Sequence, residues 1–256
     1  MIAVVDYDTG NLRSVADALH RAGAEFILTA DPALLCHADR VILPGVGEAS
    51  SAMAKLRERG LDTVIPTLTQ PVLGICIGMQ LMCLSSEEGD ARCMGIFPTR
   101  VRRLPTLTAA GERLKVPHVG WDTISELRTP LFDGMAEDTY VYYVHSFAAE
   151  PCAATVATTR YGVPFSAALG RGNFFGTTAT RSKRPCASRR RASAACTWSI
   201  STAPKPPNPT TSRCWSAWRR GRGSKCSTAA ASRAARRCAA SSTPGPAAPS
   251  AAASPS

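Results

Sequence analysis

The last third of this sequence lacks the residues that a folded domain needs. Residues 178–256 contain no Asp, Glu, Leu, Val or Phe, and their only isoleucine is Ile200. They carry 15 lysines and arginines, whereas residues 1–177 carry 15 of these against 19 acids, a net charge of −4. Such a segment buries too little apolar area to offset its chain entropy. We therefore expect residues 178–256 to form a basic, disordered tail, and the overall charge of +11 averages two unlike parts.

Histidine is also scarce, and none follows His145. This absence matters because of the segment Gly74-Ile75-Cys76-Ile77-Gly78, which ends a short apolar run and precedes a predicted helix. A cysteine between two glycines at a strand-to-helix turn is the thiol version of the Gly-x-Ser-x-Gly elbow, which lifts a nucleophile above the end of a parallel sheet. Such a thiol needs a histidine to accept its proton and a third group to orient that histidine. The sequence thus indicates a nucleophile whose base is missing.

Two further absences exclude other classes of protein. No apolar run is long enough to span a membrane, and Met1–Asp6 is typical of a strand rather than of a secretory signal. We therefore expect a cytoplasmic protein in a reducing compartment, with most of its first five cysteines as small buried thiols. The cysteine spacing predicts no metal site, and no cofactor is expected.

Short apolar strands alternate with helices over residues 1–84, which predicts an α/β fold with a mainly parallel sheet flanked by helices. We expect these strands at 2–7, 25–29, 40–43 and 71–75, and the helices at 12–22, 49–59 and 77–84. Beyond residue 94 the pattern favours strands, at 100–104, 139–147, 154–161, 165–169 and 173–176. In parallel sheets, sites form at the carboxyl ends of the strands, where Cys76 and the loop Pro44-Gly45-Val46-Gly47 both fall.

Five motifs occur in a fixed order along residues 1–177. They are Asp8-Thr9-Gly10-Asn11-Leu12, Pro44-Gly45-Val46-Gly47, Gly74–Gln80, Pro117-His118-Val119-Gly120-Trp121 and Tyr142-Tyr143-Val144-His145-Ser146. Together they resemble the glutaminase subunit of imidazole glycerol phosphate synthase, a class I glutamine amidotransferase of histidine biosynthesis. The resemblance implies a glutamine amidotransferase domain over residues 1–177, without the family's last strand and helix, followed by the tail at 178–256.

The resemblance also implies a reaction and a set of site residues. Cys76 would attack the side-chain amide of glutamine, release ammonia and form a glutamyl thioester that water hydrolyses. The oxyanion donors would be main-chain amides near Val46, Gly47 and Ile77, because preorganised donors stabilise each tetrahedral intermediate. The positions that match substrate contacts are Gly45, Gln80, His145 and Ser146. The ammonia would pass to a partner cyclase, a (β/α)8 barrel forming a heterodimer with this chain, and His118, Gly120 and Trp121 match positions near that interface.

The sequence departs from the family where the base is due. In the family, a strand ending Phe-Gly-x-Gln-Phe precedes His-Pro-Glu, whose histidine is the base, whereas here Phe174–Thr177 runs into Thr178-Ala179-Thr180-Arg181-Ser182. A shifted reading frame is one explanation. If residues 179–182 are encoded GCC ACC CGG AGx, reading from the third base of the alanine codon gives CAC CCG GAG, which is His-Pro-Glu. The chain as written is then expected to have little or no glutaminase activity.

Other interpretations stay open beside these. Taken alone, Cys76 could be read as a buried structural thiol, and Gly45 and Gly47 as turn glycines. His145 could be read as a substitute base, although the family carries the same His-Ser beside its catalytic histidine. A second hypothesis for the chain as a whole is a non-catalytic partner of the cyclase. The tail is otherwise a nucleic-acid-binding arm, with Trp198, Trp215 and Trp218 stacking on bases. We rank the frameshift above this last hypothesis, because the tail has no regular basic spacing.

Overall fold

A computed structural model describes residues 1–178 of the chain, and the expectations about the tail and its reading frame lie outside them. The helices are α1 (Leu12–Arg21), α2 (Pro32–His37), α3 (Ala49–Glu58), α4 (Leu61–Val64) and α5 (Ile77–Leu81), with 3-10 turns at Ile65–Thr67, Glu88–Asp90 and Pro130–Phe132. The strands are β1 (Ile2–Val5), β2 (Phe26–Thr29), β3 (Arg40–Leu43), β4 (Val72–Ile75), β5 (Ser85–Ser86), β6 (Ala91–Arg92), β7 (Arg100–Arg103), β8 (His118–Ile124), β9 (Thr139–His145), β10 (Phe147–Ala149), β11 (Thr155–Tyr161), β12 (Val163–Arg171) and β13 (Phe174–Thr177).

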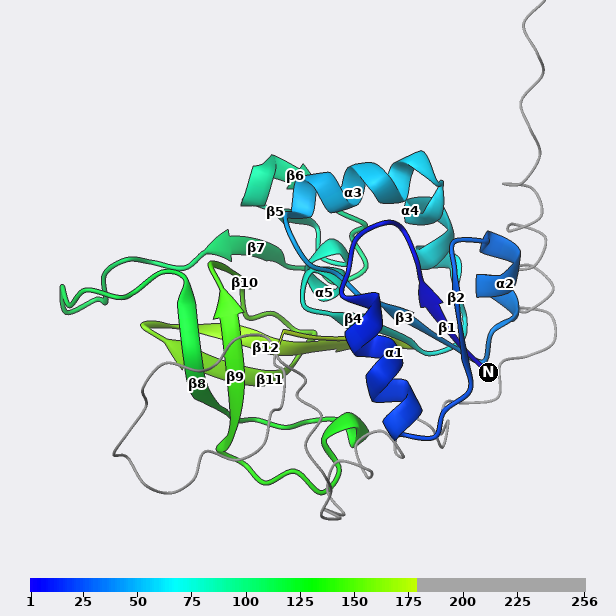
Figure 1. Cartoon of the computed structure of the whole chain (residues 1–256). Coiled ribbons are helices and arrows are strands. Elements are labelled where there is room, and N and C mark those ends of the chain that lie inside the picture. Colours follow the sequence, from blue (N-terminus) through cyan, green and yellow to red (C-terminus); the bar gives the residue numbers. More distant parts are fainter. Residues whose placement is uncertain (179–256) are drawn as a thin grey trace, which may run out of the picture.

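One mixed sheet organises the described part of the chain (Figure 1). Its strand order is β2-β1-β3-β4-β13-β12-β10-β7-β5-β6, and β11 pairs with β12. Strands β2, β1, β3, β4 and β13 run parallel to one another, whereas β12 returns antiparallel to β13. The expected parallel α/β half is therefore confirmed, and an antiparallel half continues it across β13.

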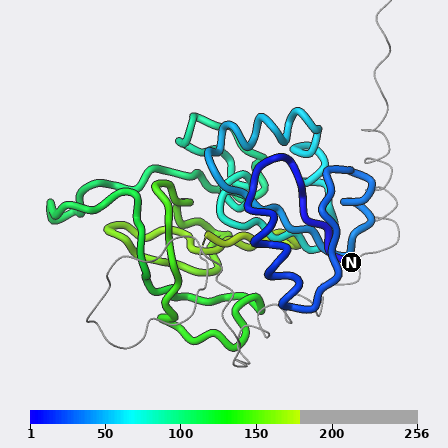
Figure 2. Tube along the Cα trace, in the orientation of Figure 1, coloured from blue at the N-terminus to red at the C-terminus, as the bar shows by residue number. Residues whose placement is uncertain are grey.

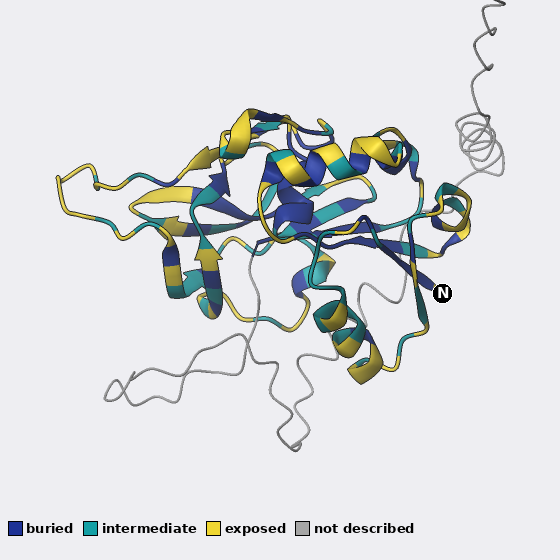
Figure 3. Ribbon diagram, turned by 45° about the horizontal axis from the view of Figure 1, so that its top comes forward, coloured by how far each residue is buried: buried dark blue, intermediate teal, exposed yellow. Residues whose placement is uncertain are grey.

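Helices cover the two faces of the parallel half unequally. Helices α3 and α5 pack on one face around a core that includes Val5, Leu43 and Met79, and α1 packs Leu19 on the other face against Ile42. Figure 3 shows the buried residues concentrated in the strands and the exposed ones on the outer sides of the helices. This arrangement leaves the carboxyl ends of β3 and β4 beside the start of α5.

Local sequence explains where the first helices begin. The side chain of Asn11 accepts a hydrogen bond from the amide of Ser14 (3.1 Å), which caps α1. Asp31 caps α2 in the same way, and Pro32 takes the first helical position, where its missing N–H costs nothing. The expected 12–22 helix is confirmed, but α2 and α4 are too short to show a helical period and were not expected.

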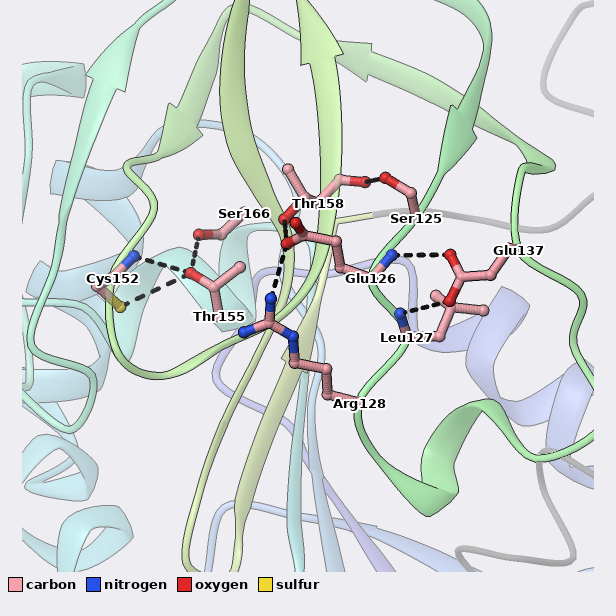
Figure 4. Close-up of polar contacts among 9 residues, drawn as sticks. All are labelled: Ser125, Glu126, Leu127, Arg128, Glu137, Cys152, Thr155, Thr158 and Ser166. Carbon is pink, nitrogen blue, oxygen red and sulfur yellow. Dashed lines mark hydrogen bonds and ion pairs between the residues drawn. The ribbon is translucent and has the colours of Figure 1, made fainter.

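A two-stranded ribbon, β8 with β9, stands apart from the main sheet. Figure 2 follows the chain from the blue and cyan parallel half into this green ribbon. The loop after β8 is fixed by Glu137, whose carboxylate accepts the amides of Glu126 (2.8 Å) and Leu127 (3.0 Å), as Figure 4 shows. Glu126 in turn accepts the hydroxyl of Thr158 on β11 (2.9 Å), which ties the ribbon to the sheet. The strand β8 was not expected.

The cysteines only partly follow the expectation of buried free thiols. Cys83 and Cys93 are free and buried, and Cys76 and Cys152 are free and half-buried. Cys36 is disulfide-bonded, so it is the exception among the first five cysteines, most of which were expected as buried thiols. It lies half-buried on the short helix α2. Within residues 1–178 no helix is long and apolar enough to cross a membrane.

Candidate active site

Cys76 occupies a sharp turn between β4 and α5, with φ 55° and ψ −115°. A residue with a side chain rarely adopts a positive φ, and holding it there costs about 1–3 kcal/mol. The turn is fixed on both sides of the cysteine. The amide of Cys76 donates to the carbonyl of Thr177 (2.8 Å), and its own carbonyl accepts the amide of Gln80 (3.2 Å). The predicted nucleophile elbow is therefore formed.

The glycines around Cys76 are required by backbone contacts. A Cβ added to Gly78 would lie 1.9 Å from the carbonyl oxygen of Leu43, and one added to Gly74 would lie 2.8 Å from the carbonyl oxygen of Gly78. A Cβ on Gly45 would lie 2.6 Å from the amide nitrogen of Gly78. Only glycine permits such close approach of one backbone to another. The elbow and the Pro44–Gly47 loop are consequently packed backbone against backbone.

The thiol of Cys76 lies in a largely apolar setting, and burial raises its pKa above the usual range. A hydrogen bond from the Ile77 amide, at the start of α5, acts in the opposite direction and favours the thiolate. The carboxylate of Glu88 raises the pKa further by like-charge repulsion. Ile77 thus presents its amide to the sulfur of Cys76, and its role as an oxyanion donor stays a prediction. Glu88 was missed, since nothing in its local sequence marks it.

The Pro44–Gly47 loop lies beside the elbow. Gly47 has φ +94°, a conformation that favours glycine, and the Val46 side chain is 38% exposed. The hydroxyl of Tyr7, which is fully buried, donates to the carbonyl of Pro44 (2.8 Å). The structure therefore brings Gly45, Val46 and Gly47 to the same edge of the sheet as Cys76.

Gln80 lies one turn along α5 from Cys76 and is only 2% exposed. Its Nε2 donates to the carbonyl of Phe147 (3.3 Å), whereas its Oε1 is buried without a hydrogen-bond partner. A buried acceptor left unpaired costs about 1–3 kcal/mol. The solvated helix surface that Gln80 alone would suggest is thereby excluded.

Both ring nitrogens of His145 face partners other than Cys76. Its Nδ1 lies 3.0 Å from the carbonyl of Phe147, and its Nε2 lies 3.3 Å from Nδ1 of His118. Burial is the main reason that the pKa of His145 falls to about 4, and His118 lowers it further. His20 meets Phe26 edge to face, and His37 bonds the carbonyl of Ala33. Within residues 1–178 no hydrogen bond joins a histidine to Cys76.

The predicted interface residues divide between the two faces of the β8–β9 ribbon. His118 pairs with His145 across the ribbon, is 4% exposed, and stacks on Tyr161 with a centroid separation of 3.8 Å. Burial lowers its pKa. Trp121 lies on the opposite face, because strand residues an odd number of positions apart point to opposite sides. Gly120 shares the inner side with His118, and Ser146 follows β9 half-buried.

The outer face of the ribbon is apolar and aromatic. The cross-strand pairs on it are Val119 with Val144, Trp121 with Tyr142, and Thr123 with Tyr140. Trp121 meets Tyr142 edge to face at 5.4 Å, and Tyr140 is 50% exposed. We name this surface, formed by Val119, Trp121, Tyr140, Tyr142 and Val144, the ribbon face.

Among the described residues, a cavity is present but a metal centre is not. A cavity of about 390 Å³ between α3 and β6 is lined by Met53, Arg57, Asp62, Arg92, Cys93 and Met94. Arg57 donates to the carbonyl of Arg92 (2.5 Å) and lies 3.9 Å from the carboxylate of Asp62. Among residues 1–178 no group of three or more His, Cys, Asp or Glu side chains is placed to hold a metal ion.

Known proteins match this chain over the same residues that form the described fold. The model of the glutamine amidotransferase class-I family matches residues 3–177. The imidazole glycerol phosphate synthase subunit HisH of Bacteroides fragilis (strain YCH46) is 51% identical over 176 residues, covering 69% of this chain and 88% of that protein. HisH of Shewanella oneidensis is 42% identical over 189 residues, covering 68% and 86%.

Solved structures agree on the fold. A GMP synthase-type protein from Thermoplasma acidophilum has a TM-score of 0.53 at 18% identity, covering 70% of this chain and 82% of that one. A glutamine amidotransferase crystal structure has a TM-score of 0.54 at 16% identity, covering 70% and 90%. At these identities the likeness shows the architecture alone.

Proposed function

The chain belongs to the class I glutamine amidotransferases, and on that premise we propose that it is a glutaminase subunit of imidazole glycerol phosphate synthase with Cys76 as its nucleophile. The observation that carries this proposal is the strained turn at Cys76, held by Gly74 and Gly78 beside the Pro44–Gly47 loop. Strained backbone conformations of this kind cluster at active sites, so the positive φ at the carboxyl end of a central strand favours a nucleophile over a structural thiol.

The proposed chemistry begins with the Cys76 thiolate attacking the side-chain amide carbon of glutamine. The Sγ–C bond forms while the carbonyl electron pair moves onto the oxygen, which needs preorganised donors. The amide of Ile77 is one donor, and the Gly45–Gly47 loop supplies the other. Collapse of this intermediate breaks the carbon–nitrogen bond. The departing nitrogen takes up the proton that the thiol gave up and leaves as ammonia, and water then hydrolyses the remaining thioester to glutamate and the free thiol.

Two polar groups fit the main-chain end of a bound glutamine. The unpaired Oε1 of Gln80 is an acceptor, and the Glu88 carboxylate lies near enough to Cys76 to raise the pKa of the thiol. Burial also raises the pKa of Glu88, while the amide of Ala49 bonds to the carboxylate (3.1 Å) and favours its charged form. We propose that these two groups bind the α-ammonium group of the substrate, which is a donor and a cation. His145 and Ser146 would then form the adjoining wall.

The chain as written is proposed to be catalytically impaired. Burial raises the pKa of Cys76, so at neutral pH a base is needed to generate the thiolate. Removing members of a Ser-His-Asp triad lowers turnover by about 10⁴ to 10⁶, which sets the scale of the expected loss. The frameshift hypothesis would explain the missing His-Pro-Glu. Resequencing codons 170–200 from independent genomic DNA checks it, and an intact frame would refute it.

The second part of the proposal is that the chain docks on a cyclase subunit, and this binding does not require catalytic activity. The ribbon face exposes Val119, Tyr140 and Val144 beside Trp121, and aromatic residues are enriched in interface centres. We propose this surface, rather than the buried His118, as the centre of the heterodimer contact. A non-catalytic partner of the cyclase is the second candidate function, favoured by the intact ribbon face together with the absent base. A cytoplasmic setting belongs to the same proposal.

The two functions are separated by measuring binding and hydrolysis on the same samples. The full chain is mixed with the cyclase subunit of Bacteroides fragilis, and complex formation and glutamate release are recorded. Complex formation with glutamate release that depends on Cys76 supports a weakened glutaminase. A complex without Cys76-dependent release supports the non-catalytic partner, and no complex at all would refute both.

A further inference from the structure

Tyr7 occupies a position that the reaction scheme above leaves unused. It follows β1 in the loop that leads to α1, and its side chain is fully buried. Its hydroxyl donates to the carbonyl oxygen of Pro44 at 2.8 Å, across 37 residues of sequence. Burial raises the pKa of Tyr7 to about 12, and the nearby Cys76 adds to the rise. The phenol is therefore a neutral donor near the nucleophile under all ordinary conditions.

The bond to Pro44 controls more than one atom. Because a peptide unit is planar, fixing the direction of the Pro44 carbonyl also fixes the amide of Gly45, which belongs to the same peptide. Gly45 is the residue whose backbone touches Gly78 in the elbow. The Tyr7 hydroxyl thus holds the first peptide of the loop that flanks Cys76.

Contacts from α3 and from the residue that follows it also fix the loop that carries Tyr7. Lys55 on α3 donates to the carbonyl of Asp8 (2.8 Å), and Arg59 pairs with the Asp8 carboxylate. Gly10, with φ +117°, lies against the Pro44 ring, since an added Cβ would be 3.3 Å from its Cγ. Pro44 is therefore held by a hydrogen bond from Tyr7, with little free space between its ring and Gly10.

We propose that Tyr7 is a positioning residue for the oxyanion loop. Its hydroxyl holds the Pro44–Gly45 peptide in the orientation from which the Gly45–Gly47 amides reach the oxygen of a carbonyl attacked by Cys76. This inference deepens the proposed glutaminase chemistry and rests on it. No contact between Tyr7 and the substrate is required.

The test compares Tyr7→Phe with Tyr143→Phe in the full chain. Tyr143 is also buried, and its hydroxyl bonds to Thr159 (2.6 Å) within the ribbon and sheet rather than beside Cys76. Each substitution removes one buried hydroxyl and keeps the ring. Cys76 is labelled at alkaline pH with a chloromethyl ketone analogue of glutamine, whose sulfur–carbon bond forms as chloride leaves and whose ketone oxygen needs the loop donors. Iodoacetamide, which uses no oxyanion donor, is the reference reagent.

The measured quantity is the ratio of the two labelling rates. Losing one oxyanion donor costs about 10²–10³ in rate, and a loosened loop loses part of that, so we expect the ratio to fall about tenfold in Tyr7→Phe. It should stay within about twofold of wild type in Tyr143→Phe, because the lost hydroxyl bonds to Thr159 and not to the loop, and the ring stacked on His145 is kept. An unchanged ratio in Tyr7→Phe overturns the inference.

Hydrogen exchange separates failure of this inference from failure of the proposed function. Amides of residues 43–49 should exchange faster in Tyr7→Phe than in wild type or Tyr143→Phe. If the wild-type chain shows no preference for the glutamine analogue, the proposed glutamine site is wrong. Equal exchange in all three proteins refutes the positioning role of Tyr7 whatever the labelling shows.

Discussion

Replacing Gly78 with alanine should break the elbow at its tightest contact. The added Cβ would lie 1.9 Å from the Leu43 carbonyl oxygen and 2.9 Å from its carbon. An ordinary carbon–oxygen contact is more than an ångström longer than the first of these, and both partners are backbone atoms of buried elements. Overpacking of this kind costs about 1–3 kcal/mol and sometimes more. We expect Gly78→Ala to lose at least about 3 kcal/mol, a large share of a typical 5–15 kcal/mol.

Thermal unfolding measures this cost directly. A loss of about 3 kcal/mol lowers Tm by roughly 6–12 °C for a domain of this size. Gly120→Ala is the matched control, since nothing lies within 4 Å of its added Cβ and its φ is not positive. Gly176→Ala should fall between the two, because its added Cβ meets the flexible Met79 side chain at 2.3 Å. If Gly78→Ala is as stable as Gly120→Ala, the backbone packing described for the elbow is wrong.

Three further predictions concern Cys76, His145 and the ribbon face. Because burial raises the pKa of Cys76, its alkylation by iodoacetamide should reach half its maximum rate above about pH 8.5, the value of a free cysteine; a midpoint below pH 7 would contradict this. His145 binds its proton near pH 4 when folded and near 6.5 when unfolded, so the free energy of unfolding should fall by up to about 3 kcal/mol as pH drops through that window. His145→Gln should remove much of that slope, and an unchanged slope would refute the assignment. Trp121→Ala should weaken cyclase binding about 30-fold, whereas Leu34→Ala, which removes an apolar side chain that is 45% exposed on α2, should not; equal effects would place the interface elsewhere.

The local features that sequence could predict are those that depend on one turn or one period. The elbow followed from glycines at fixed spacing around Cys76, and the parallel strands followed from apolar runs separated by helical periods. The strand β8 was not predicted, because the residues of His118–Ile124 do not alternate cleanly between buried and exposed positions. His118 was also grouped with Trp121 in the sequence-based prediction, whereas strand parity puts them on opposite faces of the ribbon.

Contacts between distant segments were beyond the reach of sequence reasoning. Nothing local shows that the Gln80 amide would lack a partner for its oxygen, or that Glu88 would lie near the thiol. The bond from Tyr7 to Pro44 likewise depends on how two loops meet in space. The general position of the site at the ends of β3 and β4 was predictable, whereas its polar partners were set by tertiary packing.

Glutamine hydrolysis by the full chain in the presence of a cyclase subunit tests the central claim most directly. The claim is that an intact nucleophile elbow at Cys76 stands without its histidine base. Compared with HisH of Bacteroides fragilis under the same conditions, the chain should release glutamate at least about 10⁴-fold more slowly. Turnover within tenfold of that relative, abolished by Cys76→Ser, would contradict the claim and would mean that a base acts on Cys76 after all.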